Sequence, residues 1–218
     1  MIAILRPFAG LFLSLLISNT PLHAQRSGNW NLKNNKDGVK VYFKKTADVH
    51  EIKLVTSLQT SLSGLVQLFS EVEHYPIWGY KVLESKLLKK VSDTEMYYYS
   101  KLDFPWPLSD RDLIMHTHLE QDPITKCIIA RSVAEPGYLP ENKDVVRIKN
   151  AHTQWTLLPG TGGWPYIEYY IYSDPGGNLP DWLVNMAIDV GPRETIKAMR
   201  GLLQQDKYKK AKLAHIKD

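Results

Sequence analysis

The 218-residue sequence predicts a single α+β domain in which an antiparallel sheet packs against a long C-terminal helix. Short segments of alternating apolar and polar residues follow one another between turn signals, which is typical of strands in antiparallel order. Near the C-terminus the apolar or small residues recur at helical spacing instead, through Val184, Ile188, Thr195 and Met199. No internal repeat or low-complexity linker divides the chain, so we expect one domain.

The first 24 residues have the pattern of a secretory signal peptide. Arg6 precedes an apolar run at residues 8–17, and Ala24 offers a cleavage site. The run is shorter than the roughly 20 residues that span a bilayer, so a retained anchor is the less favoured alternative. The sequence therefore predicts export, to the periplasm or outside the cell, and a mature domain at residues 25–205.

Five strands are expected in the N-terminal half, at residues 30–33, 39–44, 52–60, 82–91 and 95–102. Asp37-Gly38 between the first two is a hairpin turn signal. Ser61 or Ser63 can cap a short helix that runs past Phe69, because a serine hydroxyl accepts a hydrogen bond from a free N–H of the first turn.

Four further strands are expected in the second half, at residues 113–120, 127–134, 145–157 and 166–173. The segment 104–112 before them is too rich in proline for a central strand, and Asp110-Arg111-Asp112 is suited to brace a loop. Residues 174–178 break the last strand, and Pro180 suits the start of the long helix. Pro192 should kink that helix, because it removes one backbone hydrogen bond.

Alternation also predicts which strand residues face the helix. The expected inward residues are Met96, Tyr98, Ser100, Leu113, Met115, Thr117, Leu119, Val146, Ile148, Asn150, Ile167, Tyr169 and Ile171. Hydroxyl and amide groups are common among them. They indicate either a lined cavity or a filled core with hydrogen-bonded hydroxyls, and the sequence leaves both open.

The charge distribution excludes a general affinity for nucleic acid. Without the leader, which contains Arg6, 26 basic residues face 23 acidic ones, a net charge of +3. Residues 206–218 hold five Lys and two Asp, also +3, so the body before this lysine-rich tail is balanced. We expect the tail to be a solvated, frayed end, with contact to anionic lipid head groups as the alternative.

No local pattern indicates catalysis, a cofactor or a metal. The sequence has no glycine-rich phosphate loop and no nucleophile elbow. His116 and His118 share one strand face, but a third ligand is not evident and alternation turns them toward solvent. Cys127 is the single cysteine, so no intrachain disulfide is possible, and its apolar neighbours favour a small buried side chain over a nucleophile.

Four segments together resemble START domains, the lipid-transfer domains related to the steroidogenic acute regulatory protein. They are FPWPLSDRD at residues 104–112, DPGGNLPDWLVN at 174–185, DGVKVY at 37–42, and GYLP at 137–140 with VVR at 145–147. The match runs in order from about residue 30 to residue 204. Each motif alone has little specificity, whereas the set is specific.

The resemblance implies a helix-grip fold, in which a curved antiparallel sheet surrounds a hydrophobic tunnel closed by the C-terminal helix. Domains of this family bind one lipid and are mostly not enzymes. The residues expected to contact the ligand are Met96, Tyr98, Ser100, Trp106, Leu113, Met115, Thr117, Ile129, Arg131, Val146, Ile148, Tyr169, Ile171, Val184, Ile188, Thr195 and Met199.

Two positions bear on the nature of the ligand. Cholesterol-binding members carry an acidic–basic pair on neighbouring strands, and this sequence has Ser100 and Thr117 near those places, which puts a sterol held by such a pair in doubt. Arg131 is a charge within an apolar strand. It faces water or anchors a ligand head group.

The sequence therefore predicts an exported, non-enzymatic carrier or sensor of a lipid-like molecule, with transient contact to membranes. One alternative is an enzyme on the same scaffold, a cyclase or hydrolase of a hydrophobic substrate, for which Tyr98 and His152 are the only candidate residues. The other is an interaction module with a filled core. Failure to bind any lipid probe would distinguish it from a carrier.

Overall fold

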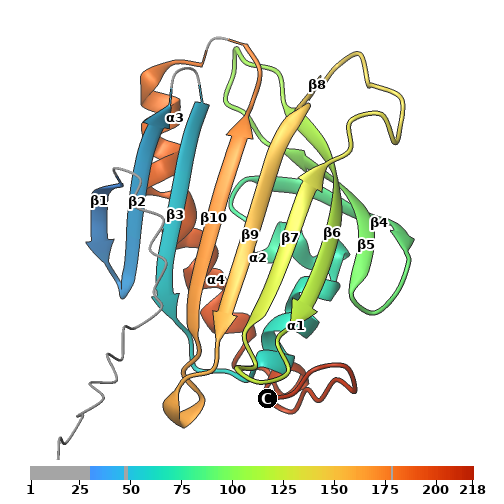
Figure 1. Cartoon of the computed structure of the whole chain (residues 1–218). Helices are drawn as coiled ribbons and strands as arrows, with labels where there is room; N and C mark the ends of the chain where they lie inside the picture. Colours follow the sequence, from blue (N-terminus) through green and yellow to red (C-terminus); the bar gives the residue numbers. More distant parts are fainter. Residues whose placement is uncertain (1–29, 47–48, 178) are drawn as a thin grey trace, which may run out of the picture.

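The computed structural model describes residues 30–46, 49–177 and 179–218, so the predicted signal peptide lies outside the described residues. The strands form one sheet in the order β1-β2-β3-β10-β9-β7-β6-β5-β4, with β8 beside β6 (Figure 1). They are β1 (Asn31–Lys36), β2 (Val39–Thr46), β3 (Val49–Ser57), β4 (Val82–Lys90), β5 (Glu95–Leu102), β6 (Arg111–Gln121), β7 (Ile128–Ala134), β8 (Val146–Arg147), β9 (Asn150–Leu158) and β10 (Tyr166–Asp174). Along this order every neighbouring pair is antiparallel, and only β8 pairs in parallel.

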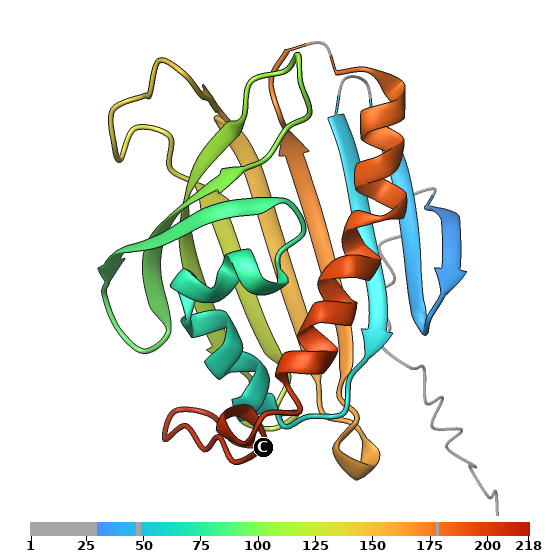
Figure 2. The same ribbon diagram turned by 180° about the vertical axis from the view of Figure 1, so that it is seen from behind.

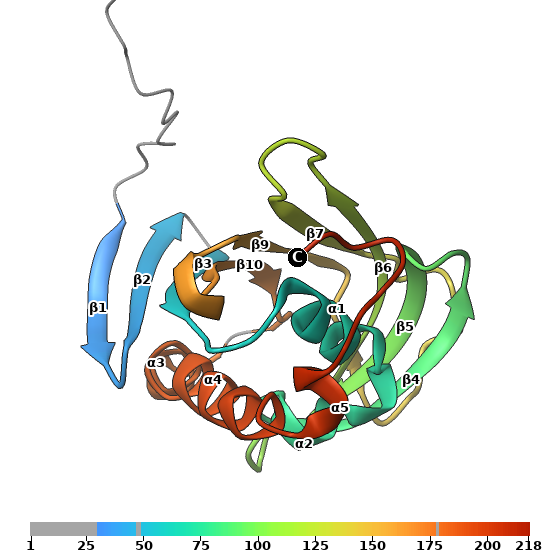
Figure 3. The same ribbon diagram turned by 90° about the horizontal axis from the view of Figure 1, so that it is seen from below.

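The sheet is curved, and the main helices lie on its concave side (Figure 3). The helical elements are α1 (Leu62–Ser70), η1 (Val72–His74), α2 (Tyr75–Trp78), η2 (Thr161–Gly163), α3 (Asp181–Asp189), α4 (Gly191–Leu202) and α5 (Asp206–Lys209). Seen from behind, α3 and α4 cross the concave side diagonally (Figure 2). We call the end at which α3 begins the upper end and the end that holds the C-terminus the lower end. The predicted helix-grip fold is confirmed.

Two local signals work as the sequence predicts. Asp37 and Gly38 have φ angles of 55° and 71°, the left-handed pair that a two-residue hairpin turn requires. Ser61 is the residue before α1, and its hydroxyl accepts a hydrogen bond of 3.0 Å from the backbone N–H of Gly64. The turn at Asp37-Gly38 joins the two strands of the first hairpin, and the Ser61 cap sets the start of the first helix.

The long C-terminal helix is divided at Val190. The first part, α3, ends at Asp189, and α4 begins at Gly191, with Pro192 in its first turn. Since proline has no N–H to donate to the preceding turn, it is tolerated only where a helix starts. The predicted kink is therefore present, and the helix is two segments.

The segment 145–157, predicted as one strand, is two strands. The break separates β8 from β9 and reverses the alternation, so that Ala151 and Trp155 face inward and Asn150 is exposed. The cause is Arg147, whose side chain is buried in an ion pair with Asp112 of the adjacent β6. The expectation that Asn150 faces inward is wrong for this reason.

An apolar core fills the lower half between the sheet, α1 and α4. Its most buried members include Leu54, Leu65, Leu68, Ile128, Leu157, Ile167, Ile196 and Met199, each at most 1 % exposed. Core packing at this end leaves the largest space in the middle of the concave side.

The lysine-rich tail is packed, so the expectation of a solvated, frayed end is wrong. It runs beneath α1 (Figure 3), and Tyr208, Ala211 and Ile216 are buried. The side chain of Asp218 accepts hydrogen bonds of 2.8 Å from both the backbone N–H and the hydroxyl of Ser63, at the start of α1. The lysines stay at the surface, while the residues between them close the lower end.

Glu71 holds the tail to the end of α1. Its carboxylate accepts hydrogen bonds from Tyr208 (2.7 Å) and Lys207 (2.6 Å), and it also pairs with His74 (2.9 Å). Partial burial raises the pKa of Glu71, but the hydrogen bonds from Lys207, Tyr208 and His74 outweigh it, and the pKa lies below its ordinary value of 4.5.

We expect Glu71→Gln to lower the free energy of unfolding by about 1–2 kcal/mol at pH 7, because the charged acceptor is lost. A carboxyl group with a lowered folded-state pKa stabilises the fold above its unfolded-state pKa and loses that effect as pH falls through the folded value. The difference between wild type and variant should therefore shrink below pH 4.5. Urea unfolding at pH 7 and pH 3 measures it, and an unchanged difference would contradict this role of Glu71.

Candidate ligand-binding cavity

A cavity of about 370 Å³ lies between the concave face of the sheet, α2 and the α3–α4 junction. Its floor consists of inward side chains of β5, β6, β7, β9 and β10, and its roof includes Trp78, Pro192 and Thr195. The volume falls within the range of about 300–1,000 Å³ that small-molecule sites occupy. The structure therefore has a lined cavity here, and the alternative of a filled core does not hold.

Aromatic rings form much of the cavity wall. Trp155 and Tyr169 stack with ring centroids 3.8 Å apart, and Phe69 packs on Trp155 at 4.8 Å. Tyr75 meets Tyr98 edge to face at 5.3 Å. These contacts hold the rings in fixed positions, so the wall offers rigid apolar surface to whatever enters.

Hydroxyl groups interrupt this wall in pairs on neighbouring strands. The hydroxyls of Thr117 and Ser132 are 2.7 Å apart. Burial raises the pKa of the Tyr98 phenol well above its ordinary value. Burial also raises the pKa of Tyr169, to about 12. These phenols are therefore neutral at physiological pH and act as donors and acceptors without charge.

Above the cavity lies a hollow of about 220 Å³, between α3 and the segment that follows β5. Val184 and Ile188 of α3 line it together with Phe104 and Leu179, and Ala187 lines both this hollow and the central cavity. An ion pair between Lys81 and Asp103, at 2.5 Å, also borders it.

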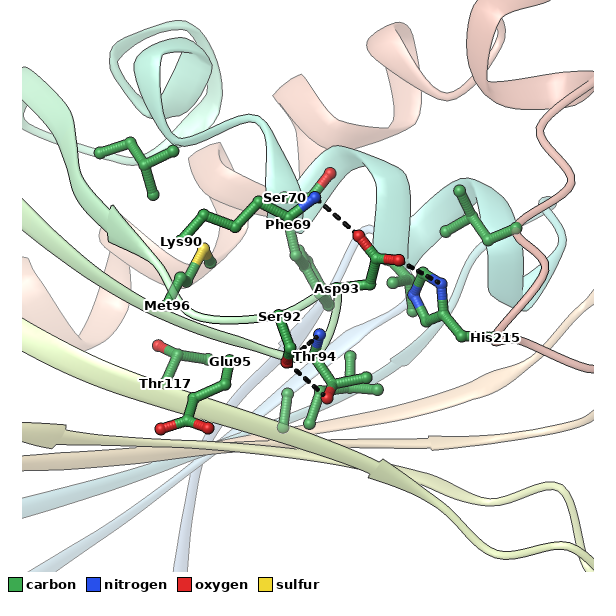
Figure 4. Close-up of a pocket in the computed structure, with 15 residues that line it drawn as sticks. Phe69, Ser70, Lys90, Ser92, Asp93, Thr94, Glu95, Met96, Thr117 and His215 are labelled. Atoms are coloured by element: carbon green, nitrogen blue, oxygen red, sulfur yellow. Dashed lines mark hydrogen bonds and ion pairs between the residues drawn. The ribbon is translucent and has the colours of Figure 1, made fainter.

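A second hollow, of about 190 Å³, extends downward between α1, the β4–β5 turn and the tail. It shares Phe69, Met96, Thr117 and Ala130 with the central cavity. Figure 4 shows Asp93 at this end between Lys90, at 2.7 Å, and His215 of the tail, at 4.0 Å. The three spaces therefore lie next to one another and share lining residues.

The Asp110-Arg111-Asp112 segment braces the upper end, as predicted. Arg111 donates to the backbone carbonyl oxygens of Pro175 and Gly176, both at 3.1 Å, and so ties the start of β6 to the loop before α3. Asp112 binds Arg147 through two hydrogen bonds, of 2.7 and 3.0 Å. The loops beside the upper hollow are held by these charged contacts.

Most of the residues expected to contact a ligand line these spaces. The central cavity is lined by Met96, Tyr98, Ser100, Leu113, Met115, Thr117, Ile148, Tyr169, Ile171 and Thr195, and the upper hollow by Val184 and Ile188. Five others do not line any of the three spaces: Trp106, Ile129, Arg131, Val146 and Met199.

Each of these five has a structural reason. In β7 the inward residues are Ala130 and Ser132, so Ile129 and Arg131 point outward, and Arg131 forms an exposed ion pair with Glu120. Trp106 is 91 % exposed in its loop, and Val146 lies in the short β8 with an exposed side chain. Met199 is fully buried in the core below the cavity.

Sequence reasoning missed several lining residues. They are chiefly Tyr75, Trp78, Ala130, Ser132, Ala151, Thr153 and Trp155. Those of β7 and β9 were missed because the predicted alternation was out of phase by one residue in both strands. A signal was available in Trp155, since a tryptophan within a strand is typically at least half-buried.

The candidates for catalysis or metal binding are not gathered at the cavity. His152 is exposed on the outer face, where it stacks on Tyr172. His116 lies on the outer face against Tyr97 and bonds to Glu95 at 2.8 Å. No group of three or more potential metal ligands occurs within the described ranges. Burial raises the pKa of the Cys127 thiol, which disfavours the reactive thiolate.

A family model and the sequences of known proteins place this chain in the same family. A model described as the START domain matches residues 22–209. An uncharacterized protein of Pseudomonas aeruginosa is 30 % identical over 179 residues, which cover 81 % of this chain and 88 % of that protein. The phosphatidylcholine transfer protein of Mus musculus is 25 % identical over 183 residues, covering 81 % and 84 %.

Solved structures of START proteins are also similar to this chain. A STAR-related lipid transfer protein fragment from Xanthomonas axonopodis superposes with a TM-score of 0.74 at 33 % identity, over 82 % of this chain and all of that one. Human STARD10 has the same fold, with a TM-score of 0.69 at 23 % identity over 83 % of this chain and 76 % of that one. Among the described helices, none has the length and apolar character needed to cross a bilayer.

Proposed function

Because this chain belongs to the START domain family, we propose that it binds one lipid-like molecule in the central cavity and carries or senses it. The observation that carries the proposal is the largely apolar central cavity of about 370 Å³, with an adjacent hollow toward each end of the concave side. The phosphatidylcholine transfer protein among the relatives supports a lipid as ligand.

The energetics favour such a ligand. Each CH₂ group moved from water into an apolar cavity contributes roughly 0.8 kcal/mol, so ten of them contribute about 8 kcal/mol before the cost of association. The hydroxyls of Tyr98, Ser100 and Thr117 can then orient the polar end.

Native mass spectrometry of the protein purified from its own compartment tests the proposal. We expect a co-purifying lipid, released on denaturation. Protein that is empty as purified and that also ignores added lipids would overturn it.

We also propose transient contact with a membrane at the upper end, where a lipid would enter. Two exposed tryptophans lie there, Trp106 (91 % exposed) in the loop after β5 and Trp182 (55 %) in the first turn of α3. The loop after β5 and the start of α3 both lie at the top of Figure 1, beside the upper hollow. Tryptophan is enriched at membrane interfaces because its ring is apolar and its N–H is polar.

Replacing Trp106 with Ala should weaken sedimentation with phosphatidylcholine vesicles about tenfold, since an inserted large side chain contributes roughly 1.5 kcal/mol. Trp164→Ala is the matched control, because Trp164 is also exposed (50 %) but follows η2 at the lower end. Equal losses for both variants would contradict an upper-end contact.

The proposed role is binding without catalysis. Tyr98 lies in the cavity and His152 on the outer face, so the two candidate residues do not form one site. Turnover of a hydrophobic substrate that is abolished by Tyr98→Phe would overturn this part of the proposal.

We further propose that the chain is exported, on the basis of the leader pattern in residues 1–24. N-terminal sequencing of the protein from its native cell should find Gln25 first. A mature protein that begins at Met1 in the cytoplasmic fraction would contradict export.

A further inference from the structure

The central cavity has polar groups but no charge. Among the described residues that line it, none is Asp, Glu, Lys, Arg or His. The polar side chains are the hydroxyls of Tyr75, Tyr80, Tyr98, Ser100, Thr117, Ser132, Thr153, Tyr169, Ser173 and Thr195, with the indole N–H of Trp78. A lipid head group placed here would meet dipoles and aromatic rings only.

The charged side chains that border the two hollows are already paired. At the upper end Lys81 pairs with Asp103 at 2.5 Å. At the lower end Lys90 pairs with Asp93 at 2.7 Å (Figure 4), and Glu95 pairs with His116 at 2.8 Å. A charged head group at either end would therefore compete with an existing partner.

Burying a charged group in this cavity costs much more free energy than burying an uncharged polar group. A carboxylate or phosphate moved out of water into this cavity would lose its hydration without gaining a counter-ion. An uncharged hydroxyl or ester oxygen would exchange hydrogen bonds with water for hydrogen bonds with the wall, at little net cost. The composition of the wall thus selects against formal charge.

Suitable partners for an uncharged oxygen are present. Thr117 and Ser132 face one another across β6 and β7, and each hydroxyl can both donate and accept. The Trp78 side chain lines the same cavity and is 9 % exposed, and its indole N–H has no acceptor among the described residues. Donors without acceptors are rare in protein interiors and point to a missing partner.

We infer that the central cavity takes a lipid whose buried polar end is an uncharged alcohol or ester, in preference to a fatty acid anion or a phospholipid head group. The inference rests on the proposed function, since it names the chemical class of the ligand for that cavity. The ligand inferred for this chain differs from phosphatidylcholine, which gives its name to a relative of this chain. The phosphocholine group of that lipid carries two formal charges.

Three ligands with the same oleoyl chain test the inference: 1-monooleoylglycerol, oleate and oleoyl-lysophosphatidylcholine. Binding to the full mature chain is measured at pH 8, below each ligand's micellar concentration. We expect the glycerol ester to bind at least about tenfold more tightly than either charged ligand, which corresponds to roughly 1.4 kcal/mol. Equal or tighter binding of a charged ligand would overturn the inference and leave the proposed function intact. Failure of all three to bind would overturn both.

A variant locates the effect. Thr117→Val removes one hydroxyl at nearly constant volume and should weaken monooleoylglycerol about fivefold, while binding of hexadecane stays unchanged. Thr156→Val is the matched control, because Thr156 lies on the outer face of β9. Thermal unfolding of each variant shows whether it folds. Unchanged ester binding by folded Thr117→Val would overturn the assignment of this hydroxyl.

Discussion

Replacing Asp112 with Asn is expected to lower the free energy of unfolding by about 3–5 kcal/mol, which is a large share of the stability of an ordinary domain. The side chains of Asp112 and Arg147 are each only 2 % exposed and share two hydrogen bonds, of 2.7 and 3.0 Å. Without the carboxylate, a guanidinium charge remains buried, and its remaining partners are carbonyl oxygens of the loop at residues 136–140.

The chain contains a matched control for this prediction. Glu120 and Arg131 also pair between neighbouring strands, at 2.5 Å, but their side chains are 53 % and 50 % exposed. Exposed pairs contribute little, so Glu120→Gln should change the free energy of unfolding by less than about 1 kcal/mol. Urea unfolding of both variants gives the comparison. Similar losses in the two would show that burial does not decide the role of Asp112.

Replacing Ala187 with Trp should weaken lipid binding about 50-fold with little effect on folding. Ala187 is exposed on α3 and lines both the central cavity and the upper hollow, so a larger side chain can occupy that space without displacing packed core. An indole that excludes three CH₂ groups of the ligand removes roughly 2.4 kcal/mol of transfer free energy, which corresponds to the expected factor.

Asn185→Trp serves as the control. Asn185 is exposed on the same helix, but it lines none of the three spaces and contacts Lys33 of β1 instead. Both substitutions place the same residue in α3, so helix propensity affects them similarly. Lipid binding measured by native mass spectrometry should fall only for the Ala187 variant. Full binding by folded Ala187→Trp would show that the ligand does not use the upper hollow.

The inward face of β5, β6 and β10 could be predicted from the sequence because their alternation is strict. Met96, Tyr98 and Ser100 share one face of β5, while Glu95 and Lys101 mark the opposite face as the polar one. In β7 the residues around Ile128 are apolar on both faces, so a period of two does not fix the phase. Pairing with β6 and β9 fixes it instead, and those contacts are not local.

The other two wrong predictions concern the break between β8 and β9 and the C-terminal tail. Both depend on contacts between segments that are far apart in sequence. The break between β8 and β9 depends on Arg147 reaching Asp112, 35 residues earlier in the chain. The tail has a lysine-rich composition that indicates a solvated end, and only its contacts with Glu71 and Ser63 bury Tyr208 and Ile216. Composition and periodicity carry no information about such pairs, which are formed between segments far apart in sequence.

The contact between Asp218 and Ser63 has a consequence for biogenesis. It joins Asp218 to a helix 155 positions earlier, so this lower closure cannot form until residue 218 has left the ribosome. The contact therefore forms after every strand of the sheet, the last of which ends at Asp174, has been synthesised. Nascent chains arrested at Gln205 should remain open to protease near Leu62, and full protection of such chains would contradict this order.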